Sequence, residues 1–183
     1  KKRDRVLIFG AGGLGLAIST MSKYYGVSDV TFVDKNFIKE KKDYIKKLNF
    51  KFCKIQNVNN IKKLIKSKIK YNQIFETTGD VKNISYCFDL LDKDSNLVLV
   101  GQPKKNKLYL NKPLKFFSNI KIFASDGGKV KPDRDIPKIL KLMNSYNKFY
   151  FNNIISHQFR LSKINQGINL LMKNKALRIS INF

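Results

Sequence analysis

Glycines near the start of the chain have the spacing of a phosphate-binding turn. The stretch from Arg5 to Gly15 reads RVLIFGAGGLG, so Gly10, Gly12 and Gly15 interrupt an apolar segment. Gly10 allows a sharp exit from a strand, Gly12 lets the backbone approach a ligand closely, and Gly15 lets the next helix lie close to the sheet. That helix presents free N–H groups and the positive end of its dipole to an anion. The pattern predicts binding of a dinucleotide pyrophosphate.

A carboxylate follows this turn at the distance that such a site requires. Residues 30–33 have the continuous apolar character of a buried strand, and Asp34 stands at its carboxyl end. In dinucleotide-binding proteins a carboxylate about 20 residues after the glycine turn binds the ribose hydroxyls. We therefore expect Asp34 to bind the adenosine ribose. Its charge would repel a 2′-phosphate and so favours NAD, although Lys35 and Lys39 nearby weaken this argument.

A parallel sheet would bring these residues together. We predict strands at residues 5–9, 30–33, 50–55, 73–76, 97–100 and 120–124, with helices marked by apolar spacing between the first five strands. This alternation predicts an α/β fold of the Rossmann type, a doubly wound, mainly parallel six-stranded sheet with helices on both faces. Gly10, Asp34, Thr78 and Gly101 would then all lie at the carboxyl ends of strands, where ligands bind.

The pattern changes towards the end of the chain. We divide it into a dinucleotide-binding domain over residues 1–125 and a helix and strand tail over residues 126–183. In the tail we expect a helix from about residue 136 to 143 capped by Asp133 or Asp135, an extended segment at 154–159, a helix capped by Ser162, and a last strand at 178–183.

The charge of the chain is its most unusual compositional feature. The 37 Lys and Arg residues outnumber the 13 Asp and Glu residues, giving a net charge of +24. The lysines are spread over every segment, and no basic block is interleaved with aromatic residues as a strand-binding surface requires. We attribute the excess to a bias towards A- and T-rich codons and do not expect nucleic-acid binding. The lysines at 41, 42, 46 and 47 are interpreted as a solvated helix face.

Cysteine and histidine are too few for a metal centre. Cys53, Cys87 and the single His157 cannot form a disulfide framework or a four-ligand zinc site, so we predict no metal ligand in the chain. The two cysteines are interpreted as core residues, which suits the cytoplasm. No apolar run reaches the roughly 18 residues of a membrane span. The start without Met, directly at a strand, suggests a piece of something longer.

With these residues placed, the chain resembles the C-terminal part of the zinc-type medium-chain alcohol dehydrogenases over nearly its whole length. The motifs that carry the resemblance are residues 4–15, ETTG at 76–79, LVLVG at 97–101, DIP at 135–137, IISHQF at 154–159, LSKINQG at 161–167 and ALRISINF at 176–183. The order and spacing of the later motifs are the most specific part of the match.

The resemblance implies an NAD site and a role for each matched residue. Gly10, Gly12, Gly13, Leu14 and Gly15 would carry the pyrophosphate together with Arg178, while Asp34 and Lys39 would bind the ribose. The remaining matched residues would flank the adenosine and the nicotinamide: Thr77, Thr78, Val100, Gly101, Gln102, Ala124 and Asp126. The resemblance also implies a homodimer through the strand Ile120–Ala124.

The same resemblance implies that this chain contains no catalytic residue. In the family, the catalytic zinc is held by Cys, His and Cys or Glu side chains of an N-terminal domain, which has no counterpart in this sequence. Without zinc to polarise a carbonyl, we expect hydride transfer between an alcohol or aldehyde and nicotinamide to be negligible in this chain alone. The tail from about Asp126 would expose the face that packs on that domain.

Two other functions remain open on the sequence. Residues 12–15 followed by GVSDVTFVD at 26–34 also resemble enzymes that adenylate a small carrier protein, but no arginine-bearing ATP site or zinc cysteine pairs follow. The chain could also be a non-catalytic nucleotide-binding module. Three assays distinguish these possibilities. Binding of NADH and NADPH tests the dehydrogenase function, ATP-dependent pyrophosphate exchange tests the adenylating function, and salt-sensitive binding of nucleic acid tests a nucleic-acid-binding role.

Overall fold

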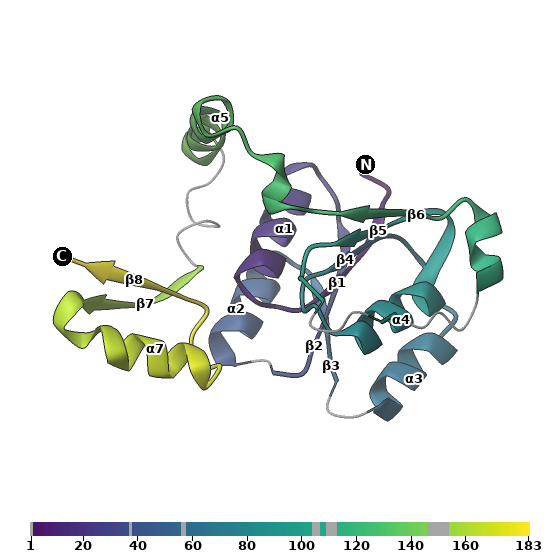
Figure 1. The fold of residues 1–183 in the computed structure, drawn as a ribbon, viewed down its shortest axis with the longest axis horizontal. Helices are drawn as coiled ribbons and strands as arrows, with labels where there is room; N and C mark the ends of the chain where they lie inside the picture. Colours follow the sequence, from purple (N-terminus) through teal and green to yellow (C-terminus); the bar gives the residue numbers. More distant parts are fainter. Residues whose placement is uncertain (1, 37, 56–57, 104–106, 109–112, 146–153) are drawn as a thin grey trace.

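The structure of the chain is a computed structural model that describes residues 2–36, 38–55, 58–103, 107–108, 113–145 and 154–183. Its main body is one six-stranded sheet in the order β3-β2-β1-β4-β5-β6, and every pairing is parallel (Figure 1). The strands are β1 (Arg5–Phe9), β2 (Asp29–Asp34), β3 (Lys51–Lys54), β4 (Tyr71–Glu76), β5 (Leu91–Leu99) and β6 (Lys121–Ala124). The predicted Rossmann-type fold is confirmed, with the order reversing between β1 and β4.

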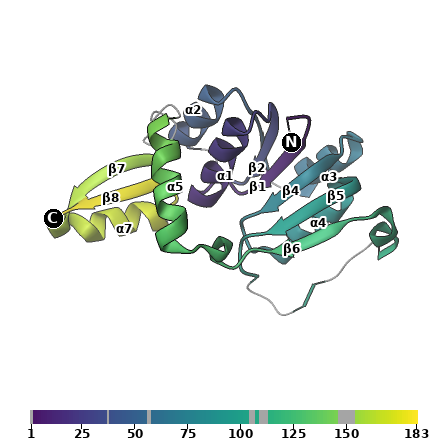
Figure 2. The ribbon, with the colours of Figure 1, turned by 90° about the horizontal axis from the view of Figure 1, so that it is seen from above.

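Helices cover both faces of this sheet. They are α1 (Gly13–Tyr24) and α2 (Lys39–Lys47) on one face and α3 (Val58–Lys66) and α4 (Val81–Leu90) on the other (Figures 1 and 2). Successive strand residues point to opposite faces, so β1 contributes Val6 and Ile8 to the core beneath α1 and α2. Its residues Leu7 and Phe9 enter the core beneath α3 and α4. β1 is therefore buried on both faces, as a central parallel strand requires.

The tail forms a smaller layer beside α2. After the 3₁₀ turns η1 (Pro113–Ser118) and η2 (Gly127–Lys129) come α5 (Pro132–Ser145), β7 (Ile155–Arg160), η3 (Leu161–Lys163), α7 (Ile164–Met172) and β8 (Arg178–Asn182). β7 and β8 pair in parallel as a separate two-stranded sheet. The tail joins the main body through Leu177, which is buried in the core beneath α1 and α2. The division at residue 125 stays a prediction.

Two predicted helix caps in the tail are wrong. α5 begins at Pro132, so Asp133 and Asp135 lie in its first turn, and the Asp135 carboxylate accepts from the backbone N–H of Lys131 at 2.9 Å. Ser162 lies inside η3, and the residue before α7 is Lys163, which makes no side-chain cap. α5 begins about one helical turn earlier than the apolar spacing indicates, whereas the 3₁₀ turn η3 takes up Ser162 and delays the start of α7 to Ile164.

The described part of the chain contains no helix that is long and apolar enough to cross a membrane. α5 stands away from the sheet (Figures 1 and 2). About half of the surface of Ile136, Ile139 and Leu140 on this helix is exposed.

Candidate dinucleotide site

The glycine turn has the backbone conformation that its sequence predicts. Gly10 has φ +97°, in the region that favours glycine, and its N–H donates to the Val33 carbonyl at 2.8 Å. A Cβ on Gly10 would lie 2.4 Å from Oγ1 of Thr77, and one on Gly15 would lie 1.9 Å from the Gly10 carbonyl oxygen. The turn therefore folds back tightly on itself, and α1 starts against the end of β1.

Gly12 lies on the open side of the turn, and Arg178 covers Gly13. A Cβ on Gly12 would meet nothing within 4 Å, so the backbone before α1 is accessible. A Cβ on Gly13 would lie 2.2 Å from Nε of Arg178, at the start of β8. The tail thus places a guanidinium directly over the first residue of α1. A cation and the positive end of a helix dipole meet at one point, and this combination binds anions.

Asp34 lies beside the turn and accepts hydrogen bonds through both carboxylate oxygens. Its Oδ2 accepts from the backbone N–H of Ala11 at 2.7 Å, and its Oδ1 accepts from the backbone N–H of Asn36 at 3.1 Å. These bonds hold the carboxylate at the carboxyl end of β2, next to the end of β1.

A buried lysine completes the surroundings of Asp34. Lys41 Nζ lies 3.3 Å from Asp34 Oδ2 and donates to the Asn36 carbonyl at 3.0 Å, with only 8% of the Lys41 side chain exposed. The interpretation of Lys41 as part of a solvated face is wrong, because its position on α2 points inwards. Lys39, which the resemblance places near the ribose, is exposed at the first residue of α2.

A second tight turn, at residues 76–79, follows β4 and packs against the end of β5. Glu76 is fully buried, and its carboxylate accepts from the backbone N–H of Thr78 at 2.9 Å, from the Thr78 hydroxyl, and from the N–H of Gly79 at 3.0 Å. A Cβ on Gly101 would lie 2.3 Å from the Gly79 nitrogen. Sequence reasoning missed this structural role of Glu76. The signal available was a carboxylate inside an apolar strand.

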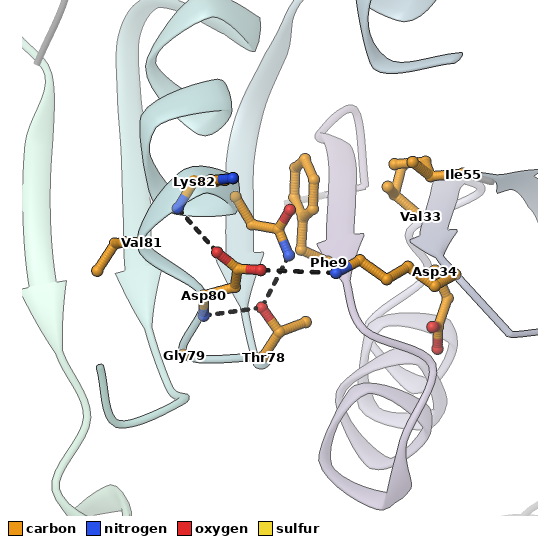
Figure 3. A pocket seen from close by; sticks show the side chains of 11 residues that line it. Phe9, Val33, Asp34, Ile55, Thr78, Gly79, Asp80, Val81 and Lys82 are labelled. Carbon is orange, nitrogen blue, oxygen red and sulfur yellow. Dashed lines mark hydrogen bonds and ion pairs between the residues drawn. The ribbon is translucent and has the colours of Figure 1, made fainter. Parts of the chain in front are cut away.

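A cavity of about 510 Å³ opens between the ends of β1, β2 and β4 (Figure 3). Its polar lining includes Asp34, Thr78 and Asp80, and Lys35 Nζ reaches Asp80 Oδ2 at 3.6 Å across the opening. The remaining lining residues are Phe9, Val33, Ile55, Gly79, Val81, Lys82 and Asn83. Sequence reasoning did not assign Asp80, Lys82 or Asn83 to the site, because they belong to the start of α4 rather than to a strand end.

The other predicted site residues are not among those that line this cavity. Thr77 turns its hydroxyl to the Phe9 carbonyl at 2.8 Å, and Leu14 is half exposed on the first turn of α1. Val100 and Gly101 follow β5 and both donate backbone N–H groups to the Glu76 carbonyl. Gln102, Ala124 and Asp126 lie further along the same edge, at or after the ends of β5 and β6.

A protein family described as zinc-binding dehydrogenase matches residues 13–145, which is most of the chain. The chain belongs to this family. The match corresponds to the C-terminal, nucleotide-binding part of medium-chain alcohol dehydrogenases, as the resemblance predicted.

Individual dehydrogenases show the same correspondence. Alcohol dehydrogenase 2 of Oryza sativa subsp. japonica is 27% identical over 192 residues, which cover 97% of this chain and 48% of the rice protein. The structure of benzyl alcohol dehydrogenase from Acinetobacter calcoaceticus superposes with a TM-score of 0.82 at 20% identity, covering 97% of this chain and 49% of that one. Glucose dehydrogenase of Haloferax mediterranei, solved with NADP, zinc and gluconolactone, has a TM-score of 0.81 at 15% identity and the corresponding coverages are 97% and 50%. The chain spans about half the length of the relatives that it matches.

Metal-ligating side chains do not gather in the described ranges. No group of three or more His, Cys, Asp or Glu residues there could hold a metal ion. His157 instead stacks on Phe159 with ring centroids 6.3 Å apart, and its Nδ1 lies 2.9 Å from the Ser156 hydroxyl. Burial raises the pKa of the Cys53 thiol, and burial together with the nearby Glu76 raises the pKa of the Cys87 thiol well above its ordinary value.

Proposed function

We propose that the chain is the NAD(H)-binding part of an alcohol dehydrogenase-like oxidoreductase of the cytoplasm. The observation that carries this proposal is the convergence of the open Gly12 backbone, the N-terminus of α1 and the Arg178 guanidinium at one point. Asp34 lies next to that point, joined to the turn through the N–H of Ala11. Pyrophosphate and ribose need these two kinds of group side by side.

The residues present fit a dinucleotide. The backbone of Gly12 and Gly13 together with Arg178 would hold the pyrophosphate, and no Cβ fills the space in front of Gly12. Asp34 would bind the ribose hydroxyls, since a carboxylate oxygen can accept a further hydrogen bond beyond those it already has. The cavity between β1, β2 and β4 would take the adenine. When bound, the nicotinamide group supplies the hydride acceptor or donor of the reaction.

NAD is the cofactor that we propose, because the Asp34 carboxylate can accept hydrogen bonds from the free ribose hydroxyls of NAD. The fold itself does not decide between NAD and NADP, because the Haloferax neighbour was solved with NADP.

We also propose that the catalytic zinc and the alcohol or aldehyde pocket of the active enzyme are formed with residues outside these 183. The chain spans about half the length of its relatives, which supports the proposal that other residues form the zinc site and the substrate pocket. Zinc would act as a Lewis acid on the substrate oxygen. The part of the enzyme represented by this chain then contributes binding and orientation of the cofactor, and we expect the chain alone to transfer hydride at a negligible rate.

Calorimetric titration of the purified chain with NADH tests the proposal. We expect saturable one-to-one binding, and the variant R178A should weaken it by about tenfold through loss of a charged contact to the pyrophosphate. The matched control is R160A, which removes an exposed arginine from β7 and should leave the affinity unchanged. Absence of NADH binding in the folded wild type would contradict the proposal.

A homodimer through β6 is a further part of the proposal. β6 is the last strand of the sheet, its four residues are all exposed, and 41% of Ile122 and 49% of Phe123 are accessible. An exposed apolar edge strand can pair with a second copy and extend the sheet. Sedimentation equilibrium should show a dimer that F123D converts to monomer, whereas a monomeric wild type would refute it.

A further inference from the structure

Lys41 is the least expected residue near the proposed nucleotide site. It is one of 37 basic residues in the chain, yet its side chain is 92% buried on the inner face of α2. Its ammonium contacts Asp34 Oδ2 and the Asn36 carbonyl oxygen, which belong to the end of β2 and the loop that follows. Burying an ammonium is costly unless an opposite charge accompanies it, so Asp34 serves as the counter-ion of Lys41.

The charges around the cavity balance without Lys41. The charged residues that line it are Asp34, Lys35, Asp80 and Lys82. Lys35 pairs with Asp80 across the opening. Lys41 therefore adds one positive charge directly behind the carboxylate that would bind the ribose. The negative charge of Asp34 is therefore paired with a positive charge on the side chain of Lys41.

We infer that Lys41 is a specificity-determining residue of this site: its buried ammonium neutralises Asp34 and allows the ribose to carry a 2′-phosphate. This inference rests on the proposed function. A 2′-phosphate brings a charge of about −1.5 to −2 close to Asp34, and an adjacent cation offsets the repulsion. Asp34 still accepts hydrogen bonds from ribose hydroxyls, so NAD continues to bind.

Lys41 carries this effect better than Lys35, although Lys35 lines the cavity. The Lys35 side chain is 75% exposed, and Asp80 already compensates its charge. Solvent and salt screen an exposed ammonium much more than a buried one. A buried lysine that already donates to two protein oxygens also loses no further side-chain conformational entropy when a ligand binds.

Two adenosine nucleotides test the inference without the nicotinamide half. We would titrate the chain calorimetrically with AMP and with adenosine 2′,5′-bisphosphate and compare the ratio of their dissociation constants. In the wild type the bisphosphate should bind no more than about tenfold more weakly than AMP. The variant K41Q keeps an amide donor towards Asp34 and removes the charge, and it should raise the ratio by about tenfold.

Control variants separate charge from packing. K41R keeps a buried cation and should keep the wild-type ratio, whereas K46Q removes an exposed lysine of the same helix and should also leave it unchanged. A ratio that rises by less than about threefold in K41Q, or to the same extent in K46Q, overturns the inference. If K41Q does not fold, the ratio of the two dissociation constants in the wild type tests the inference. A bisphosphate that binds the wild type more than about tenfold more weakly than AMP would show that the charge of Asp34 is not compensated, and would overturn the inference.

The experiments distinguish failure of the proposed function from failure of the proposed role of Lys41. A folded wild type that binds neither AMP nor the bisphosphate nor NADH refutes the proposed function and the role of Lys41 with it. Binding of AMP and NADH with strong rejection of the bisphosphate refutes the role of Lys41 alone.

Discussion

The Arg178 guanidinium occupies the position that a side chain on Gly13 would need, with Nε only 2.2 Å from the site of the missing Cβ. A residue of β8 is thereby fitted into the first turn of α1, more than 160 positions earlier in the chain. The glycine at this position makes room for the Arg178 guanidinium.

Replacement of Gly13 by alanine should therefore act through Arg178. The methyl group meets the end of a flexible side chain, so we expect the free energy of unfolding to change by less than about 1 kcal/mol while NADH affinity falls by about tenfold. Titrations of G13A, R178A and the double variant check this. The double variant should bind about as weakly as each single one, and fully additive losses would show that the two residues act independently.

Replacement of Gly15 should instead damage the fold. A Cβ there would lie 1.9 Å from the Gly10 carbonyl oxygen, which is backbone and cannot rotate away. We expect G15A to lower the free energy of unfolding by about 2–4 kcal/mol in urea denaturation. The control is G12A, where a Cβ meets nothing within 4 Å and stability should be nearly unchanged. Equal stability of the two variants would contradict the geometry of the turn.

Loss of the Asp34 charge should destabilise the chain even without nucleotide. D34N leaves the buried Lys41 ammonium without its counter-ion, which we expect to cost about 1–3 kcal/mol, since Asp34 itself is 18% exposed. D34N/K41M removes both charges and should recover most of the loss. D29N, at a carboxylate that is 35% exposed and paired with Arg5 and Lys51, should cost less than about 1 kcal/mol. If D34N is no less stable than D29N, the ion pair has no structural role.

The two cysteines should differ in reactivity and in their effect at alkaline pH. Cys87 is fully buried and its pKa is raised well above the ordinary value, so maleimide should label Cys53 first and Cys87 only on unfolding. Above pH about 9 the unfolded chain releases the Cys87 proton and the folded chain retains it. Stability should therefore fall as pH rises, and this fall should be smaller in C87A than in C53A. Mass spectrometry and urea denaturation at pH 7 and 10 check both points.

The sequence predicted the sheet well because buried parallel strands are continuous apolar runs, and because the glycine turn marks the exit of β1. Asp34 was placed correctly at the end of β2 because it directly follows an apolar run. The roles of Lys41 and Glu76 could not be read in the same way, since each depends on backbone groups that only the folded chain brings near. The burial of Lys41 could have been predicted from one feature of the sequence. Lys41 lies three residues after Ile38 and three before Tyr44, a spacing that places it on the inward face of α2.

The tail was harder to predict. One cap was misplaced because α5 begins at Pro132, before its apolar spacing becomes visible. The other was misplaced because Ser162 lies within η3, so α7 begins only at Ile164. The contact between Arg178 and Gly13 could be foreseen only from the family resemblance, since nothing in local sequence joins residues so far apart.

The position of β1 between β2 and β4, with helices over both of its faces, links the binding turn to global unfolding. Solvent can reach the amide hydrogens of Leu7 and Ile8 only when both helical layers and both neighbouring strands separate. Hydrogen exchange of these amides should therefore be among the slowest in the chain and follow complete unfolding. Because the glycine turn directly continues β1, a ligand bound at this turn would raise the free energy of unfolding of the whole sheet.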